Sequence, residues 1–360
     1  MQGRAPQRPT QQFSHQHWLE SVRHEESTHS TPVRVFFLGS GRLAVPVLET
    51  LLTDSRLMLA GIGTQPDRPA GRRQHLLATP VGQFAQARGL AVTKPDSVNT
   101  PAFLDPLREL TPDLIVVVSF GQILKHELLH LSDFGCLNVH ASLLPRHRGA
   151  SPVNAVILAG DTETGVSFMR MDAGLDTGPV YRVLQLPLTG AETAPELEER
   201  LARLAAEHIG ACVWDVCRGG LQPVAQAPDG ATCAKKLKKE DGVLDWCQPA
   251  HVLERRVRGL QPWPRAFIRV PTGNAVRRVQ IVRAGVADVV GPVVVPGTVL
   301  EAGKTGWVVG CGSGALRLLR VVPEGRHEMD AAEFLRGCPV PAGTNLAMAH
   351  VNGDGATEIK

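Results

Sequence analysis

The sequence predicts a doubly wound α/β domain with a mostly parallel, Rossmann-like sheet, followed by a small β-barrel domain. An apolar β-rich run at 33–38, a Gly-Ser-Gly turn and a helical pattern at 43–52 form the strand–turn–helix opening of an α/β domain. A continuous β-branched run at 114–119 is typical of a strand buried on both faces of a parallel sheet. Beyond residue 260, short β-runs alternate with glycine and proline turns, which is typical of a small barrel.

The first half of the chain alternates between the apolar spacing typical of strands and the apolar spacing typical of helices. Strands are predicted at 33–38, 57–63, 90–93, 114–119, around 138–140, 164–171 and 180–187, and helices at 43–52, 79–88, 103–110, 123–129, 152–158 and 193–217. The last of these helices is amphipathic, and a Gly-Gly pair ends it. The segment 65–79 contains proline, glycine and arginine and is predicted to project from the domain as a loop.

The second half predicts an oligonucleotide-binding-like (OB-like) barrel. A helix is predicted at 250–257, strands at 266–270, 276–282, 293–300, 306–310 and 316–321, and a final helix at 331–336. The predicted organisation is therefore a disordered extension at 1–31, the α/β domain at 32–220, a linker at 221–229, the barrel domain at 230–348 and a tail at 349–360.

Composition restricts the class of protein. The 360 residues are 43% hydrophobic and 20% charged, which is ordinary for a globular protein with two cores. The net charge of +3 is too small to indicate a nucleic-acid partner by itself, but residues 228–350 hold 17 Lys and Arg against 11 Asp and Glu. This basic half could contact a polyanion or could be a solvated face without a partner.

The cysteines and the length of the apolar runs indicate the cellular compartment. Seven cysteines without a C-x-x-C pair argue against a disulfide framework and a zinc site, and they fit a reducing environment. No apolar run reaches the length of a membrane span, and the N-terminus lacks the apolar region of a signal peptide. We expect a cytoplasmic protein, with the mitochondrial matrix as the second choice.

Three polar residues follow the predicted strands in a way that suggests a site. Asn138 and His140 are two residues apart, so on a strand their side chains point to the same face. Asp176 stands in a glycine-punctuated loop after the next strand. Ligands of open α/β sheets bind at the carboxyl ends of the strands, where these residues are expected. Each has an ordinary structural role when taken alone, as a strand-end residue or a turn cap, and His147 in the nearby basic turn is expected to be a bystander.

Two longer segments carry a family resemblance. The segment 138–146, Asn-Val-His-Ala-Ser-Leu-Leu-Pro-Arg, and the segment 172–178, Asp-Ala-Gly-Leu-Asp-Thr-Gly, resemble the folate-dependent formyltransferases. Thr-Gln-Pro-Asp-Arg-Pro-Ala-Gly-Arg at 64–72, Ala-Lys-Lys-Leu at 234–237 and Asp-Trp at 245–246 narrow the resemblance to members that act on methionyl-tRNA. The resemblance extends from about residue 33 to about residue 348.

The resemblance implies a reaction and a set of site residues. The reaction is transfer of a formyl group from 10-formyltetrahydrofolate to the α-amine of methionine on initiator tRNA, without a metal, by a protein expected to be a monomer. The implied catalytic residues are Asn138, His140 and Asp176. The implied folate contacts are Ser142, Leu143, Leu144 and Pro145, and the implied tRNA contacts are Arg68, Arg72, Arg73, Lys235 and Lys236. Asp176 could either orient His140 or pass protons through a water molecule.

Other functions remain open on the sequence. Relatives of this chemistry formylate amino sugars or nucleotide amines, or hydrolyse formyl-folate. A Rossmann oxidoreductase using nicotinamide is suggested by Gly39-x-Gly41-x-x-Ala44, but the second predicted strand ends in Thr64-Gln65, where that fingerprint requires an acidic residue. A non-catalytic RNA-binding protein would not need the Asn138, His140 and Asp176 set. The family usually has proline at the position of Gly41, and lysines where this chain has Gln74-His75.

Overall fold

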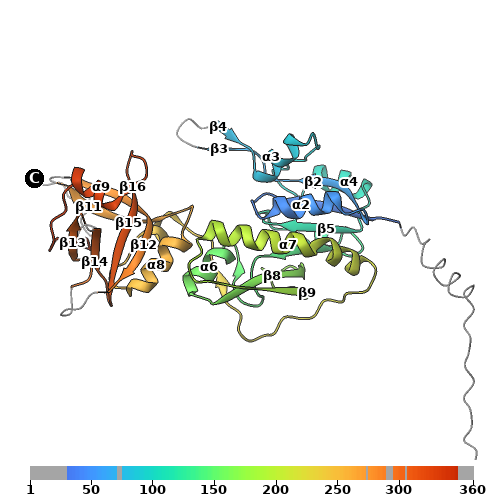
Figure 1. The fold of residues 1–360 in the computed structure, drawn as a ribbon. Helices are drawn as coiled ribbons and strands as arrows, with labels where there is room; N and C mark the ends of the chain where they lie inside the picture. Colours follow the sequence, from blue (N-terminus) through green and yellow to red (C-terminus); the bar gives the residue numbers. More distant parts are fainter. Residues whose placement is uncertain (1–30, 71–74, 273–274, 289–294, 305, 348–360) are drawn as a thin grey trace, which may run out of the picture. The chain divides into compact units, whose positions relative to one another are not determined.

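The computed structural model describes residues 31–70, 75–272, 275–288, 295–304 and 306–347 (Figure 1). Most of the predicted N-terminal extension, the predicted tail, Arg72 and Arg73 lie outside the described residues. The compact unit that contains both predicted domains begins at Val33. In the described ranges, no helix has the length and apolar character that crossing a bilayer requires.

The first half is built on a six-stranded sheet. Its strand order is β2-β1-β5-β6-β8-β9, with β1 at Val33–Gly39, β2 at Leu57–Gly63, β5 at Leu114–Val118, β6 at Cys136–His140, β8 at Glu163–Arg170 and β9 at Val180–Pro187. The first four strands are parallel, whereas β8 and β9 each run antiparallel to their neighbour. The predicted mostly parallel sheet is therefore confirmed.

Helices cover both faces of this sheet because its central strand is apolar on both sides. Leu114, Val116 and Val118 of β5 pack into one core, and Ile115 and Val117 into the other. The first core is shared with α2 (Ala44–Thr53), α6 (Pro152–Ala159) and α7 (Ala194–Cys217), and the second with α4 (Pro101–Glu109) and α5 (His126–Leu129). The remaining helix of this half, α3, spans Pro80–Ala87. Figure 1 shows α7 running beside β8.

Two short segments differ from the sequence expectations. The loop predicted at 65–79 contains an antiparallel hairpin of β3 (Arg68–Ala70) and β4 (His75–Leu77). The strand predicted at 90–93 is not formed, and only Thr93 pairs, in an isolated bridge with Gly63 at the end of β2. Leu90 and Val92 instead pack against the first core, which explains their apolar character without a ladder.

The second half is an antiparallel half-barrel, which confirms the OB-like prediction. Its strand order is β11-β12-β15-β14-β13, with β16 pairing on β15. The bounds are β11 Ala266–Thr272, β12 Ala275–Ala287, β13 Val299–Gly303, β14 Gly306–Gly310, β15 Ala315–Pro323 and β16 Met329–Asp330, with helices η1 Lys239–Gly242, α8 Ala250–Gly259 and α9 Ala331–Gly337. β13 begins at Val299, and the described residues 295–298, which the prediction placed in this strand, form a turn instead, while 293 and 294 lie outside the described residues. Trp307 of β14 stacks on Phe334 of α9 with ring centroids 5.5 Å apart in this core.

A second small pairing lies at the junction of the two halves. β7 (Arg148–Gly149) runs parallel to β10 (Cys233–Ala234), although 85 residues separate the paired positions. The segment before β10 is also paired, because Val224 exchanges two backbone hydrogen bonds of 2.8 Å with Val180 of β9. The chain between α7 and the half-barrel therefore lies against the α/β sheet and its loops.

Candidate active site

Strand β6 presents the first two candidate residues at its carboxyl end. Asn138 and His140 project from the same face of β6 because they are two residues apart. Asn138 is half-buried, and the His140 side chain is 5% exposed. β6 lies between β5 and β8, so the site sits in the interior of the sheet rather than at its edge.

The third residue comes from the loop that joins β8 to β9. Asp176 has a positive φ of 53°, a left-handed conformation that non-glycine residues rarely adopt. Its Oδ1 lies 3.4 Å from Nδ2 of Asn138, and its Oδ2 lies 3.6 Å from Nδ1 of His140. The structure thus brings together three polar side chains that the sequence places in two separate segments.

The His140 ring is oriented by a backbone carbonyl. Nε2 of His140 lies 3.0 Å from the carbonyl oxygen of His147. Because that oxygen only accepts hydrogen bonds, Nε2 carries the proton and donates it. Burial lowers the pKa of the His140 imidazole from its ordinary value, and the Asp176 carboxylate and the bond to His147 oppose part of that shift. A neutral ring then keeps its lone pair on Nδ1, which faces Asp176 and can accept a proton.

His147 is a structural part of the site rather than a bystander. It is buried and has a φ of 57°. Its Nε2 lies 2.7 Å from Oδ2 of Asp161, and its N–H donates to Oγ1 of Thr232 at 2.8 Å. These contacts hold the carbonyl that orients His140. Sequence reasoning missed this role because the partners are 14 and 85 residues away.

Gly149 supports the carboxylate. Its N–H donates to Oδ2 of Asp176 at 2.7 Å. Its φ is 124°, and a Cβ at this position would lie 2.5 Å from the carbonyl oxygen of Ala234. Glycine is therefore required for the β7–β10 pairing and for the hydrogen bond to Asp176.

Gln226 is a further residue that sequence reasoning missed. Its Nε2 donates to the carbonyl oxygens of Asp176 and Gly178, at 2.8 and 2.7 Å. Its Oε1 accepts from Nε and Nη2 of Arg148, at 3.0 and 2.7 Å. A single amide thus joins the basic turn to the loop of Asp176. Gln226 lies in the segment predicted as a linker, where its residue type carries no local signal.

The turn after β6 is tied down by hydroxyl groups. The Oγ of Ser142 donates to the carbonyl of Arg146 at 2.6 Å. Ser167 on β8 donates to the Ser142 carbonyl at 2.7 Å and accepts from the N–H of Leu144 at 3.1 Å. These bonds use the hydroxyls internally and leave the side chains of Leu143, Leu144 and Pro145 half-buried at the surface of the turn.

A cavity of about 540 Å³ adjoins the site. Ala141, which directly follows His140, lines it, as do Ser119 at the carboxyl end of β5 and Lys236. Trp263, whose side chain is 54% exposed, forms another part of the wall. The cavity therefore combines a flat aromatic surface and a cation next to β6, and the carboxyl group of Glu198 also lines it.

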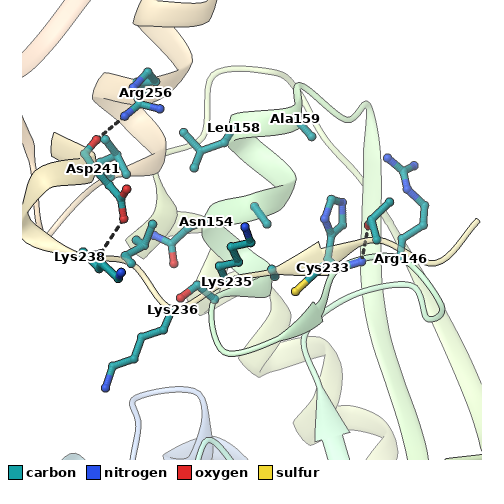
Figure 2. A pocket seen from close by; sticks show the side chains of 17 residues that line it. Arg146, Asn154, Leu158, Ala159, Cys233, Lys235, Lys236, Lys238, Asp241 and Arg256 are labelled. Atoms are coloured by element: carbon teal, nitrogen blue, oxygen red, sulfur yellow. Dashed lines mark hydrogen bonds between the residues drawn. The ribbon is translucent and has the colours of Figure 1, made fainter. Parts of the chain in front are cut away.

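The candidate tRNA residues fall on different segments. Arg68 is exposed on β3, and Lys235 and Lys236 are exposed directly after β10. Figure 2 shows the two lysines at a second cavity of about 560 Å³, which the basic residues Arg146, Lys238 and Arg256 also line. Arg72 and Arg73 lie outside the described residues.

No metal site accompanies these residues in the part of the chain that the structure describes, where no group of three His, Cys, Asp or Glu side chains could hold an ion. The side chains that meet at the site are an amide donor, an imidazole proton acceptor and a carboxylate.

Comparison with known proteins identifies the family. A model described as formyl transferase matches residues 33–212, and one described as formyl transferase, C-terminal domain, matches residues 236–339. A methionyl-tRNA formyltransferase of Trichlorobacter lovleyi is 42% identical over 317 residues, covering 88% of this chain and 98% of the relative. One from Xylella fastidiosa is 46% identical over 305 residues, covering 84% and 97%. The chain therefore belongs to the formyltransferase family, in the branch of the methionyl-tRNA formyltransferases.

Solved structures share the fold at much lower identity. An N-formyltransferase from Helicobacter canadensis, in complex with folinic acid and dTDP-3-aminofucose, has a TM-score of 0.58 and 15% identity over 79% of this chain and 98% of that one. HypX from Aquifex aeolicus, in complex with tetrahydrofolic acid, has a TM-score of 0.55 and 17% identity over 85% of this chain. The present chain spans about half the length of HypX, since it covers 47% of that chain.

Proposed function

We propose that the protein transfers a formyl group from 10-formyltetrahydrofolate to the α-amino group of methionyl-tRNA, for translation initiation. The observation that carries the proposal is the convergence of Asn138, His140 and Asp176 at the carboxyl end of β6. The name and the nearly full-length match of the bacterial relatives supply the substrate. Their bacterial origin also supports a cytoplasmic reaction.

The three side chains divide the work of an acyl transfer. The uncharged amine attacks the formyl carbon, and the carbonyl oxygen becomes an oxyanion. The Asn138 amide N–H donates to that oxygen and stabilises it. Nδ1 of His140 accepts the proton that the attacking nitrogen loses, and the Asp176 carboxylate at 3.6 Å stabilises the resulting imidazolium. The same proton then passes to the folate nitrogen as its bond to the formyl carbon breaks.

Folate and tRNA would bind on different elements. We assign the folate contacts to the turn of Ser142, Leu143, Leu144 and Pro145, where backbone groups and apolar side chains are held by Ser167. The cavity beside Trp263 suits the methionine-bearing adenosine, because an aromatic ring can stack on the base. The phosphate contacts are assigned to the cations Arg68, Arg72, Arg73, Lys235 and Lys236.

The test is a formyl-transfer assay with labelled 10-formyltetrahydrofolate and several amines. We expect label on methionyl-tRNA, and none on glycinamide ribonucleotide or a dTDP-amino sugar. Nicotinamide absorbance, followed in the same reactions, should not change. Label on the amino sugar, with none on tRNA, would assign the protein another substrate.

A further inference from the structure

Gln226 occupies a position that the reaction itself does not explain. It lies between α7 and β10, outside the strands and loops that carry the three candidate catalytic residues. Its amide nevertheless makes four hydrogen bonds, two to each of the segments that meet at the site. Both lone pairs of the oxygen and both hydrogens of the nitrogen are therefore used.

The chemistry of the partners fixes which way the amide faces. The guanidinium of Arg148 only donates, so the Gln226 oxygen must face it. The carbonyls of Asp176 and Gly178 only accept, so the nitrogen must face them. No alternative orientation satisfies all four groups, and a carboxylate at this position would point an oxygen at two carbonyl oxygens.

The peptide group that Gln226 holds belongs to a residue with an unfavourable backbone conformation. Asp176 has a φ of 53°, which is unfavourable for a residue with a Cβ and persists where surrounding contacts determine it. Gln226 binds the carbonyl of that residue, while the N–H of Gly149 binds its carboxylate at 2.7 Å. Arg148, whose guanidinium donates to Gln226, directly precedes Gly149 in the chain. The carboxylate and its backbone are thus fixed from one short turn.

The segment that carries Gln226 is anchored on both sides. Val224 exchanges two 2.8 Å hydrogen bonds with Val180, just beyond the Asp176 loop. The carbonyl oxygen of Thr232 accepts a hydrogen bond from the N–H of Arg148 at 2.9 Å, and the carbonyl oxygen of Ala234 accepts one from the N–H of Ala150 at the same distance. Gln226 therefore lies in a strap, residues 224–234, which crosses from the Asp176 loop to the basic turn.

We propose that Gln226 is a positioning residue, which acts through Asp176 by holding the Asp176 peptide in the conformation that directs the carboxylate at His140 and Gly149. The role of Asp176 in this inference rests on the proposed function. All four hydrogen-bonding positions of the Gln226 amide are used within the protein, so its replacement should lower kcat and leave KM for tRNA and for folate nearly unchanged.

The experiment compares Gln226→Ala and Gln226→Glu with Gln222→Ala, whose side chain is exposed four residues earlier, just before the strap. We expect both Gln226 variants to lose roughly 10-fold to 100-fold in kcat, because small misplacements of catalytic groups have effects of that size. We expect the rate of Gln222→Ala to remain that of the wild type. In an Asp176→Asn background, Gln226→Ala should add little, since both changes act on one carboxylate. An unchanged kcat, or a loss that is fully additive with Asp176→Asn, would overturn the inference.

A second measurement does not depend on the substrate. NMR titration of His140 in the free protein should shift in the same direction in Gln226→Ala as in Asp176→Asn, because both remove the carboxylate from Nδ1. The groups that face His140 are Asp176 and His147, and Gln226→Ala leaves both in the chain. If the wild type formylates a different amine, kcat is measured with that amine, so a wrong substrate and a wrong role for Gln226 give different results. An unshifted His140 titration in Gln226→Ala would contradict the role.

Discussion

Nδ1 of His140 lies 3.6 Å from Oδ2 of Asp176, which is within ion-pair range but longer than a hydrogen bond. The ring is instead hydrogen-bonded through Nε2, at 3.0 Å, to the carbonyl of His147. These two distances indicate that one residue orients the imidazole ring and another stabilises its charge. His147 sets the direction of the imidazole, and Asp176 stabilises the positive charge that appears when Nδ1 takes a proton.

Asn138→Ala removes the proposed oxyanion donor. We expect kcat to fall by roughly 10² to 10³, as for other donors of this kind. Asn99→Ala provides a matched control, because that amide lies away from the site and donates to the carbonyl of Ile123. Single-turnover formylation of methionyl-tRNA measures the effect. A rate close to that of the wild type would remove Asn138 from the mechanism.

The titration of His140 tests the charge argument. Because burial lowers its pKa, NMR titration of the free protein should give a midpoint below the ordinary value of about 6.5. Asp176→Asn should lower the pKa further, since the carboxylate favours the cation. Asp172→Asn is the control, because that carboxylate binds the N–H of Gly174 and the hydroxyl of Thr177 instead. A raised midpoint in Asp176→Asn would contradict the assignment.

The same shift has consequences for activity and stability. The neutral ring is the proton acceptor, so the contribution of His140 to the rate should be lost as pH falls through its folded-state pKa. The unfolded chain binds a proton at higher pH than the folded one, so this group destabilises the fold as pH drops below about 6.5. Urea unfolding of wild type and His140→Asn across pH 5–8 measures this. A stability difference independent of pH would show that the ring is not buried neutral.

Gly149→Ala tests the packing beneath the carboxylate. A Cβ would meet the Ala234 carbonyl at 2.5 Å, and the φ of 124° adds backbone strain of about 1–3 kcal/mol. Gly219→Ala is the matched control, because its φ is 74° and nothing lies within 4 Å of the added Cβ. We expect the control to cost about 1–2 kcal/mol in unfolding free energy and to keep its kcat. Gly149→Ala should lower the unfolding free energy by more than the control does, and it should also lower kcat. Equal effects of the two substitutions would show that the close approach of Gly149 to Ala234 is not important.

Alanine at both Lys235 and Lys236 tests the basic cavity of Figure 2. If both ammonium groups contact phosphates, KM for tRNA should rise and KM for folate should not. The slope of log affinity against log salt should fall by roughly 1.5 to 2, because fewer counterions are released. Lys304→Ala, an exposed lysine of the half-barrel, provides the comparison. An unchanged salt slope would place the phosphate contacts elsewhere.

Elements with a strong local pattern were predictable to the residue. β2 and β14 have the predicted bounds, Leu57–Gly63 and Gly306–Gly310, because each is an apolar run that ends at a glycine. The strand expected at 90–93 failed for the opposite reason. Its residues are apolar, but the chain there meets only the last residue of β2, so a single bridge forms. An apolar run shows that a segment is buried and does not show that a partner strand is available.

By itself, the sequence determined the fold class, the family and the identity of Asn138, His140 and Asp176 as candidates. The fold class follows from periodicity, and the family follows from segments that resemble a known family and contain the three candidates. The tertiary structure alone decided how these side chains are held. The carbonyl of His147, the amide of Gln226 and the close approach of Gly149 to Ala234 depend on contacts between residues as much as 85 positions apart. Backbone groups and glycines carry no chemical signature in a sequence, so their roles emerge only when folding places them against a partner.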